Sequence, residues 1–112
     1  MTATEAPVQA QLDAYNAQDV ERFVACYAED VEVFELATGT RQFASRAAMR
    51  ERYAALFTAN PKLRCRVVTR VVEGAFVVDH EDLTGRADGG TKRVLAIYQV
   101  ENGLIRRVWF AR

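Results

Sequence analysis

Histidine, cysteine, tryptophan and proline are scarce in this sequence, and their scarcity narrows what the protein can do. The chain of 112 residues holds one histidine, one tryptophan, two cysteines and two prolines. Cys26 and Cys65 lack the close spacing of zinc or redox motifs, so we expect two free, buried thiols. Glu35, His80 and Asp82 are residue types that can bind a metal, but no two of them have the spacing of metal ligands within one helix or strand. We therefore expect no metal and no other cofactor.

A charge excess of one sign and a long apolar run are also absent. Fifteen Lys and Arg residues balance 15 Asp and Glu residues, which excludes the uniformly basic surface of a nucleic-acid-binding protein. No apolar run reaches the roughly 18 residues of a transmembrane helix. Residues 1–15 lack the basic start and apolar centre of a secretory signal. We expect one cytoplasmic domain over residues 1–112 that binds neither nucleic acid nor membranes.

Apolar residues recur at helical spacing in three segments of the first half of the chain. The first helix is expected to end near Asn16, and a second, short helix to follow the cap residue Asp19. The third runs from the cap residue Ser45 to Asn60, because the residue before Pro61 avoids helical dihedral angles. Three helices are therefore predicted before residue 61.

Alternation with a period of two predicts the strands. The segments with this pattern are residues 30–36, 63–73, 76–84, 91–100 and 104–112. Asn102 and Gly103 form a strong tight-turn pair between the last two. Helices followed by a consecutive antiparallel meander indicate an α+β domain, with helices covering one face of a curved sheet.

The order of these segments resembles a known superfamily. The blocks YNAQD and CYAEDVEVFE, then SRAAMRERYAALF, then long strands ending in NGLIRRVWF, are similar to the nuclear transport factor 2-like superfamily, in particular its SnoaL-like and steroid Δ-isomerase-like members. The resemblance runs from about Val8 to Phe110. It implies a cystatin-like cone: a curved antiparallel sheet with three N-terminal-half helices packed on its concave face around a pocket. It also implies a homodimer through the outer face of the sheet, where Trp109 is expected.

Residues 76–84 hold the only histidine and concentrate titratable groups on one strand. One face carries Phe76, Val78, His80, Asp82 and Thr84, and the other carries Val77, Asp79, Glu81 and Leu83. The resemblance places the first face in the pocket, so that Val78, His80 and Asp82 line it. Asp79 and Glu81 would then lie outside, beside arginines of neighbouring strands. A one-residue slip or a bulge would exchange the two faces.

Glu35 and His80 are the candidate catalytic residues. In the ketosteroid isomerases an acidic residue on the first strand is the general base, and Glu35 stands at the matching position. It shares a strand face with Val31 and Val33, and burial there would raise its pKa toward neutrality. The alternative is a glutamate exposed at the end of a strand. Imidazole suits proton transfer near neutral pH, so His80 would exchange a proton with that carboxylate.

Tyrosines are the candidate hydrogen-bond donors. The resemblance aligns Gln11 and Ala96 with the two oxyanion donors of the ketosteroid isomerases, so both donors are missing and a steroid isomerase of that kind is not implied. Tyr15, Tyr27 and Tyr53 are expected to line the pocket and donate instead. Each also fits a core aromatic residue with its hydroxyl at the rim.

Three functions remain open. The first is binding of a hydrophobic small molecule, such as a cyclic ketone or a polyketide-like compound, with cofactor-independent isomerisation, dehydration or cyclisation by acid–base chemistry. The second is a non-catalytic binding or dimerisation module. The third is activation of a water by Glu35 and Asp82, as in the epoxide hydrolases of this fold. Convergence of Glu35, His80 and a tyrosine hydroxyl on one apolar cavity would favour the first.

Overall fold

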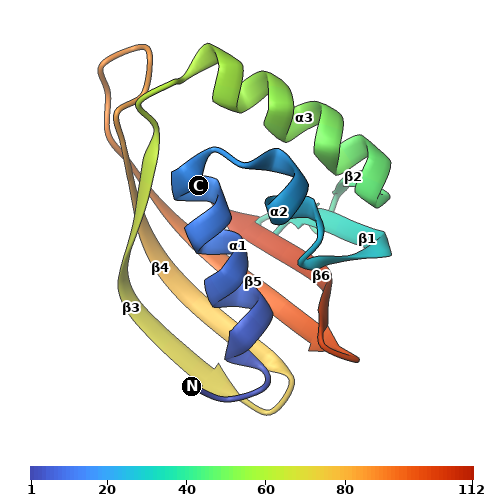
Figure 1. Ribbon diagram of the computed structural model, residues 1–112. Coiled ribbons are helices and arrows are strands. Elements are labelled where there is room, and N and C mark those ends of the chain that lie inside the picture. The colour runs from blue at the N-terminus through green and yellow to red at the C-terminus, as the bar shows by residue number, and fades with distance from the viewer.

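Three helices cover one face of a six-stranded sheet in the computed structural model, which describes residues 1–112 (Figure 1). The helices are α1 (Glu5–Ala17), α2 (Val20–Val24) and α3 (Arg46–Ala59). The strands are β1 (Tyr27–Glu35), β2 (Arg41–Ala44), β3 (Arg64–Glu73), β4 (Phe76–Thr84), β5 (Lys92–Glu101) and β6 (Leu104–Ala111). The predicted α+β architecture is confirmed. No helix is both long and apolar enough to cross a membrane.

The sheet order is β2-β1-β6-β5-β4-β3. Strands β3 to β6 form the predicted antiparallel meander, whereas β1 joins β6 in parallel, so the sheet is mixed. The short strand β2 pairs with β1 and was not predicted, because four residues are too few to establish an alternating pattern. In Figure 1 the sheet bends around α1, and α2 and α3 lie on the same side of it.

Side-chain caps begin the second and third helices where the sequence indicates. The Asp19 carboxylate accepts a hydrogen bond from the backbone N–H of Arg22 at 3.1 Å. The Ser45 hydroxyl accepts one from the backbone N–H of Ala48 at 3.1 Å. Both satisfy an N–H group that has no partner within the helix. These two predicted caps are confirmed.

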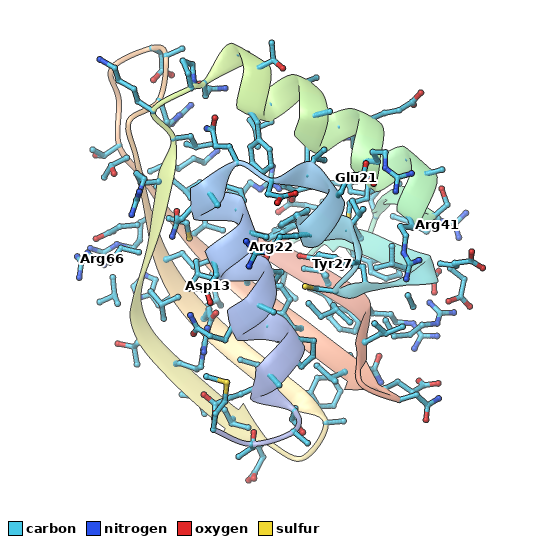
Figure 2. All side chains as sticks on the ribbon, viewed as in Figure 1. Asp13, Glu21, Arg22, Tyr27, Arg41 and Arg66 are labelled. Atoms are coloured by element: carbon cyan, nitrogen blue, oxygen red, sulfur yellow. The ribbon has the colours of Figure 1, made fainter.

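The hydrophobic core fills the space between the helices and the sheet. It is a cluster of 15 buried residues drawn from the helices and from β1, β4, β5 and β6. Figure 2 shows Tyr27, the first residue of β1, beside α2; it is 2% exposed, whereas Asp13 and Glu21 are exposed on the helices. The core does not fill all of this space, and the gap that remains is the candidate site.

Two asparagines tie the helix ends to the sheet and fix one end of that gap. The Asn16 side chain donates to the backbone carbonyl of Cys65 at 2.9 Å and accepts from its N–H at 2.8 Å. The Asn60 side chain accepts from the backbone N–H of Ala87 at 2.9 Å and donates to Leu56 at 2.9 Å. The C-terminal ends of α1 and α3 are thereby joined to β3 and to the loop between β4 and β5.

Candidate functional site

A cavity of about 410 Å³ lies between the helices and the concave face of the sheet. Thirteen of its 20 lining residues are hydrophobic. The apolar wall comes from Leu12, Phe23, Leu56, Leu63, Leu83, Val94 and Phe110, among others. Four of the 13 are tyrosines, which also bring hydroxyl groups to the wall: Tyr15, Tyr27, Tyr53 and Tyr98. Gln11 and Glu81 are among the polar lining residues. A largely apolar cavity with a few convergent polar groups is the usual form of a small-molecule site.

Glu81 is the one carboxylate in the interior of this cavity. It lies on β4 opposite Val94 of β5 and is only 6% exposed. Burial and, to a smaller extent, the negative charge of Asp79 raise the pKa of Glu81 from an ordinary value of 4.5 to about 7, against the opposing effect of the hydrogen bond with Tyr98. A carboxyl group with such a pKa is present in both protonation states near neutral pH. It can therefore accept a proton or deliver one.

A chain of hydrogen bonds connects Glu81 to the helices. The Tyr98 hydroxyl donates to Oε2 of Glu81 at 3.2 Å, and Nε2 of Gln11 approaches the Tyr98 hydroxyl at 3.4 Å. The Tyr27 hydroxyl donates to Oε1 of Gln11 at 3.0 Å. Gln11 also donates to the carbonyl of Val8 at 3.0 Å, which fixes the orientation of its amide. The carboxyl group is thus held in place by α1, β1 and β5 together.

Tyr15 and Tyr53 present hydroxyl groups with no protein partner. Both residues line the cavity, and their rings meet edge to face at 6.3 Å. Burial raises the pKa of Tyr53 to about 12 and raises that of Tyr15 as well, so both hydroxyls stay protonated at neutral pH. Neutral tyrosines in an apolar cavity can donate a hydrogen bond to an oxygen of a bound molecule.

A buried ion pair lies next to Glu81 on the same strand face. Asp79 is fully buried, and both of its oxygens accept from the Arg70 guanidinium, at 2.7 and 3.0 Å. Arg70 also donates to Gln9 of α1 at 2.8 Å and lies 3.6 Å from Glu5. These contacts attach α1 to β3 and β4 beneath the cavity, and they place the Asp79 charge two residues from Glu81.

The predicted inward face of β4 is wrong. Val77, Asp79 and Glu81 are buried beneath the helices, whereas Val78, His80 and Asp82 alternate with them on the outer face and do not line the cavity. Asp82 pairs there with Arg66 at 2.8 Å and with Arg93. Both faces of β4 carry apolar residues and carboxylates, so the alternation alone does not select one. The choice rested on alignment with the superfamily's meander, and that alignment favoured the wrong face.

Glu35 also lies outside the cavity. It ends β1, at the turn that leads to β2, and Nε2 of Gln42 donates to its carboxylate at 3.4 Å. Glu35 and His80 therefore do not converge on one site. Glu35 and Asp82 do not converge on a water in this cavity either. Of the predicted site residues, Tyr15, Tyr27 and Tyr53 lie in the cavity wall, and their role in binding stays a prediction.

Sequence reasoning missed Glu81, Tyr98 and Gln11 as a connected group. One available signal was the position of Gln11, which lies three residues after Val8 and four before Tyr15 on the apolar face of α1. A polar residue in that stripe requires a buried partner. The partners are Tyr27 of β1, 16 residues away, and Tyr98 of β5, 87 residues away.

Comparisons with known proteins place the chain among related folds. The family model of the SnoaL-like domain matches residues 8–108. An uncharacterised cystatin-fold protein from Novosphingobium aromaticivorans is 27% identical with a TM-score of 0.87, covering 100% of this chain and 99% of its own. A proposed ketosteroid isomerase from Kribbella flavida is 24% identical with a TM-score of 0.81, covering 97% and 76%. A proposed polyketide cyclase from Sinorhizobium meliloti is 18% identical with a TM-score of 0.80, covering 98% and 99%. No curated protein matches.

Proposed function

The chain belongs to the SnoaL-like domain family, and from this premise we propose that it binds a small, largely apolar ketone in the inner cavity and moves a proton on it with the Glu81 carboxyl group. The observation that carries the proposal is the position of Glu81, a nearly buried carboxyl group facing an apolar cavity beside protonated tyrosines. The reaction class is isomerisation, dehydration or cyclisation without a cofactor.

Cavity size and lining support the binding part of the proposal. A volume of about 410 Å³ suits a compact molecule of two or three fused rings, since ligand sites begin at roughly 300 Å³. The aromatic rings of Tyr15, Phe23, Tyr53 and Phe57 pack against one another at centroid distances of 4.4 to 6.3 Å. This packing gives the cavity a stiff wall, which limits the freedom that is lost when a ligand binds.

Glu81 and the tyrosines support the acid–base part. A carboxylate of raised pKa would remove the proton from the carbon next to a carbonyl group and return it elsewhere on the same molecule. Negative charge then develops on the carbonyl oxygen, and a protonated tyrosine can stabilise it by donating a hydrogen bond. Tyr15 and Tyr53 have hydroxyls free for this role, because neither is engaged with the protein. Glu81 thus takes the part that the sequence assigned to Glu35 and His80.

Two structurally similar proteins suggest the substrate class that we propose, a cyclic ketone or polyketide-like compound. They are described as a ketosteroid isomerase and a polyketide cyclase, names that refer to ketone and polyketide substrates. At 24% and 18% identity they share the fold, and their names suggest a substrate class to try first. A cytoplasmic location also fits, because Cys26 and Cys65 are both free thiols.

Deuterium exchange into β-tetralone, a compact bicyclic ketone, tests the proposal. In D₂O the wild-type protein should accelerate loss of the proton signal next to the carbonyl above the buffer rate. Glu81→Gln should remove that acceleration, and Glu35→Gln should leave it unchanged. The rate should rise with pH through about 7, as the Glu81 carboxylate forms. Equal rates for wild type and Glu81→Gln would contradict the assignment.

The outer face of the sheet favours a second function, self-association. Trp109 stacks on Phe34 at 5.6 Å with an interplanar angle of 17°, and Phe76 lies 6.5 Å from the same ring. Phe76 is 40% exposed and Val71 is 56% exposed. We propose that a second copy of this chain covers this apolar face. Sedimentation should then show a dimer that Trp109→Ser dissociates. A wild-type protein that stays monomeric would contradict it.

A further inference from the structure

We infer that the molecule bound in the inner cavity is an organic anion, an apolar body with one carboxylate, and that its charged end lies between Lys92 and Arg112. The inference rests on the proposed binding function and adds the charge and the orientation of the ligand. The observations that carry it are the strand register, the pairing of the charged lining residues and the direction in which Arg112 lies.

Three basic residues, Lys92, Arg112 and Arg86, lie at one end of the cavity. Val94 is the partner of Glu81, and Lys92 lies two residues further along β5 on the same face, about 7 Å away along the strand. Arg112 directly follows Ala111, the last residue of β6, and lines the cavity as Lys92 does. Arg86 joins them from the loop between β4 and β5, which lies beside the end of α3 (Figure 1).

The charges at this end do not cancel. Arg86 forms an ion pair with Asp88 at 3.0 Å, so these two lining residues neutralise each other. Neither Lys92 nor Arg112 takes part in an ion pair. Half-buried Lys92 and exposed Arg112 therefore border the cavity as two positive charges, and neither has an ion-pair partner in the protein. A ligand anion would supply one, and an uncharged ligand would not.

Arg112 is directed over the cavity wall. Its guanidinium lies 4.7 Å from the ring centroid of Phe110, which lines the cavity. Its charge also reaches the tyrosines: burial raises the pKa of Tyr53 to about 12, and Arg112 opposes that rise. Arg112 therefore lies over the wall that Phe110 forms, and the Tyr15 and Tyr53 hydroxyls stay available to the carbonyl oxygen of the ligand.

This orientation agrees with the position of Glu81. A ligand carboxylate at the basic end stays apart from the Glu81 carboxyl group, and the uncharged part of the ligand faces it. The reverse orientation would bring two carboxylates together in an apolar space, which is unfavourable. The charge pattern thus selects one direction of entry and presents the apolar body of the ligand to the proton-transferring group.

Two fluorescent probes with one ring skeleton test the inference. Anilinonaphthalenesulfonate carries an anionic group, and N-phenylnaphthylamine is the same aromatic framework without it. Binding of both is titrated with wild type, Lys92→Gln and Arg112→Gln at low salt. Arg22→Gln is the matched control, because Arg22 is exposed on α2, forms no ion pair and does not line the cavity (Figure 2). Leu56→Trp, which narrows the cavity, reports whether the probes occupy it.

The anionic probe should bind wild type more tightly than the neutral one. Lys92→Gln and Arg112→Gln should each weaken its binding about two- to fivefold, leaving the neutral probe and the Arg22→Gln control unchanged. If both probes bind equally and the two variants have no effect, the anion inference is overturned while cavity binding stands. If neither probe binds, or if Leu56→Trp changes neither, the binding function itself is overturned together with this inference.

Discussion

Replacing Glu81 by glutamine should stabilise the protein at alkaline pH and have little effect in acid. Glutamine has nearly the same shape as a protonated glutamic acid but does not ionise. Glu81 is only 6% exposed, and burial raises its pKa in the folded protein from 4.5 to about 7. The wild-type protein therefore carries a cost that the variant lacks whenever the carboxyl group must ionise inside the fold.

The size of this cost follows from the two pKa values. Below pH 4.5 Glu81 is protonated in both the folded and the unfolded chain, and it contributes no difference. As pH rises from 4.5, the unfolded chain releases its proton while the folded chain retains it, so the free energy of unfolding falls. Above about pH 7 the fall is complete, and the difference of about 2.5 pKa units corresponds to about 3 kcal/mol.

Urea denaturation of wild type and Glu81→Gln over a pH series measures the effect. The stability difference between the two should grow by about 3 kcal/mol from acid to mildly alkaline pH. Glu51→Gln is the matched control, because Glu51 is exposed on α3 and forms no ion pair, so its difference should not change in this way. A Glu81→Gln difference that is constant across the series would refute the reasoning.

Two further substitutions test the scaffold around the site. Arg70→Met leaves the fully buried Asp79 without its partner, so urea denaturation should show a loss of about 3–5 kcal/mol in the free energy of unfolding. Arg66→Met removes an exposed ion pair and should cost under about 1 kcal/mol. Equal losses for the two variants would contradict the role of the buried pair. Gly85→Ala should lower the melting temperature, because Gly85 has a φ of 70° and an added Cβ would lie 1.9 Å from the carbonyl oxygen of Lys62. An unchanged melting temperature would contradict this close contact between residue 85 and Lys62.

Most of the fold was predictable because its signals are local. The caps Asp19 and Ser45 mark two helix starts, and the pair Asn102 and Gly103 marks the last hairpin. The parallel pairing of β1 with β6 was not predictable, since it joins segments more than seventy residues apart and leaves no pattern in either. The resemblance to the nuclear transport factor 2-like superfamily supplied the shape that local signals omit, and the related structures confirm it.

The candidate site was predicted only in part, and the reason lies in β4. Tyr15 and Tyr53 follow from helical spacing and resemblance, whereas Tyr27, the first residue of β1, follows from resemblance alone. The choice of strand face decides between His80 and Glu81. Burying Asp79 and Glu81 becomes favourable only through partners from other elements, namely Arg70 for the first and Tyr98 for the second. Pairings of this kind form in three dimensions, and the alternation of a single strand does not encode them.

The most direct test of the account is a ¹³C NMR titration of the Glu81 side-chain carboxyl carbon, assigned by its disappearance in Glu81→Gln. The account predicts a midpoint at about pH 7, because the carboxyl group is buried in the cavity beside the negative charge of Asp79. A midpoint near 4.5, the ordinary value for glutamate, would mean that the carboxyl group is hydrated. That result would contradict the proposal that Glu81 exchanges a proton with a bound molecule near neutral pH.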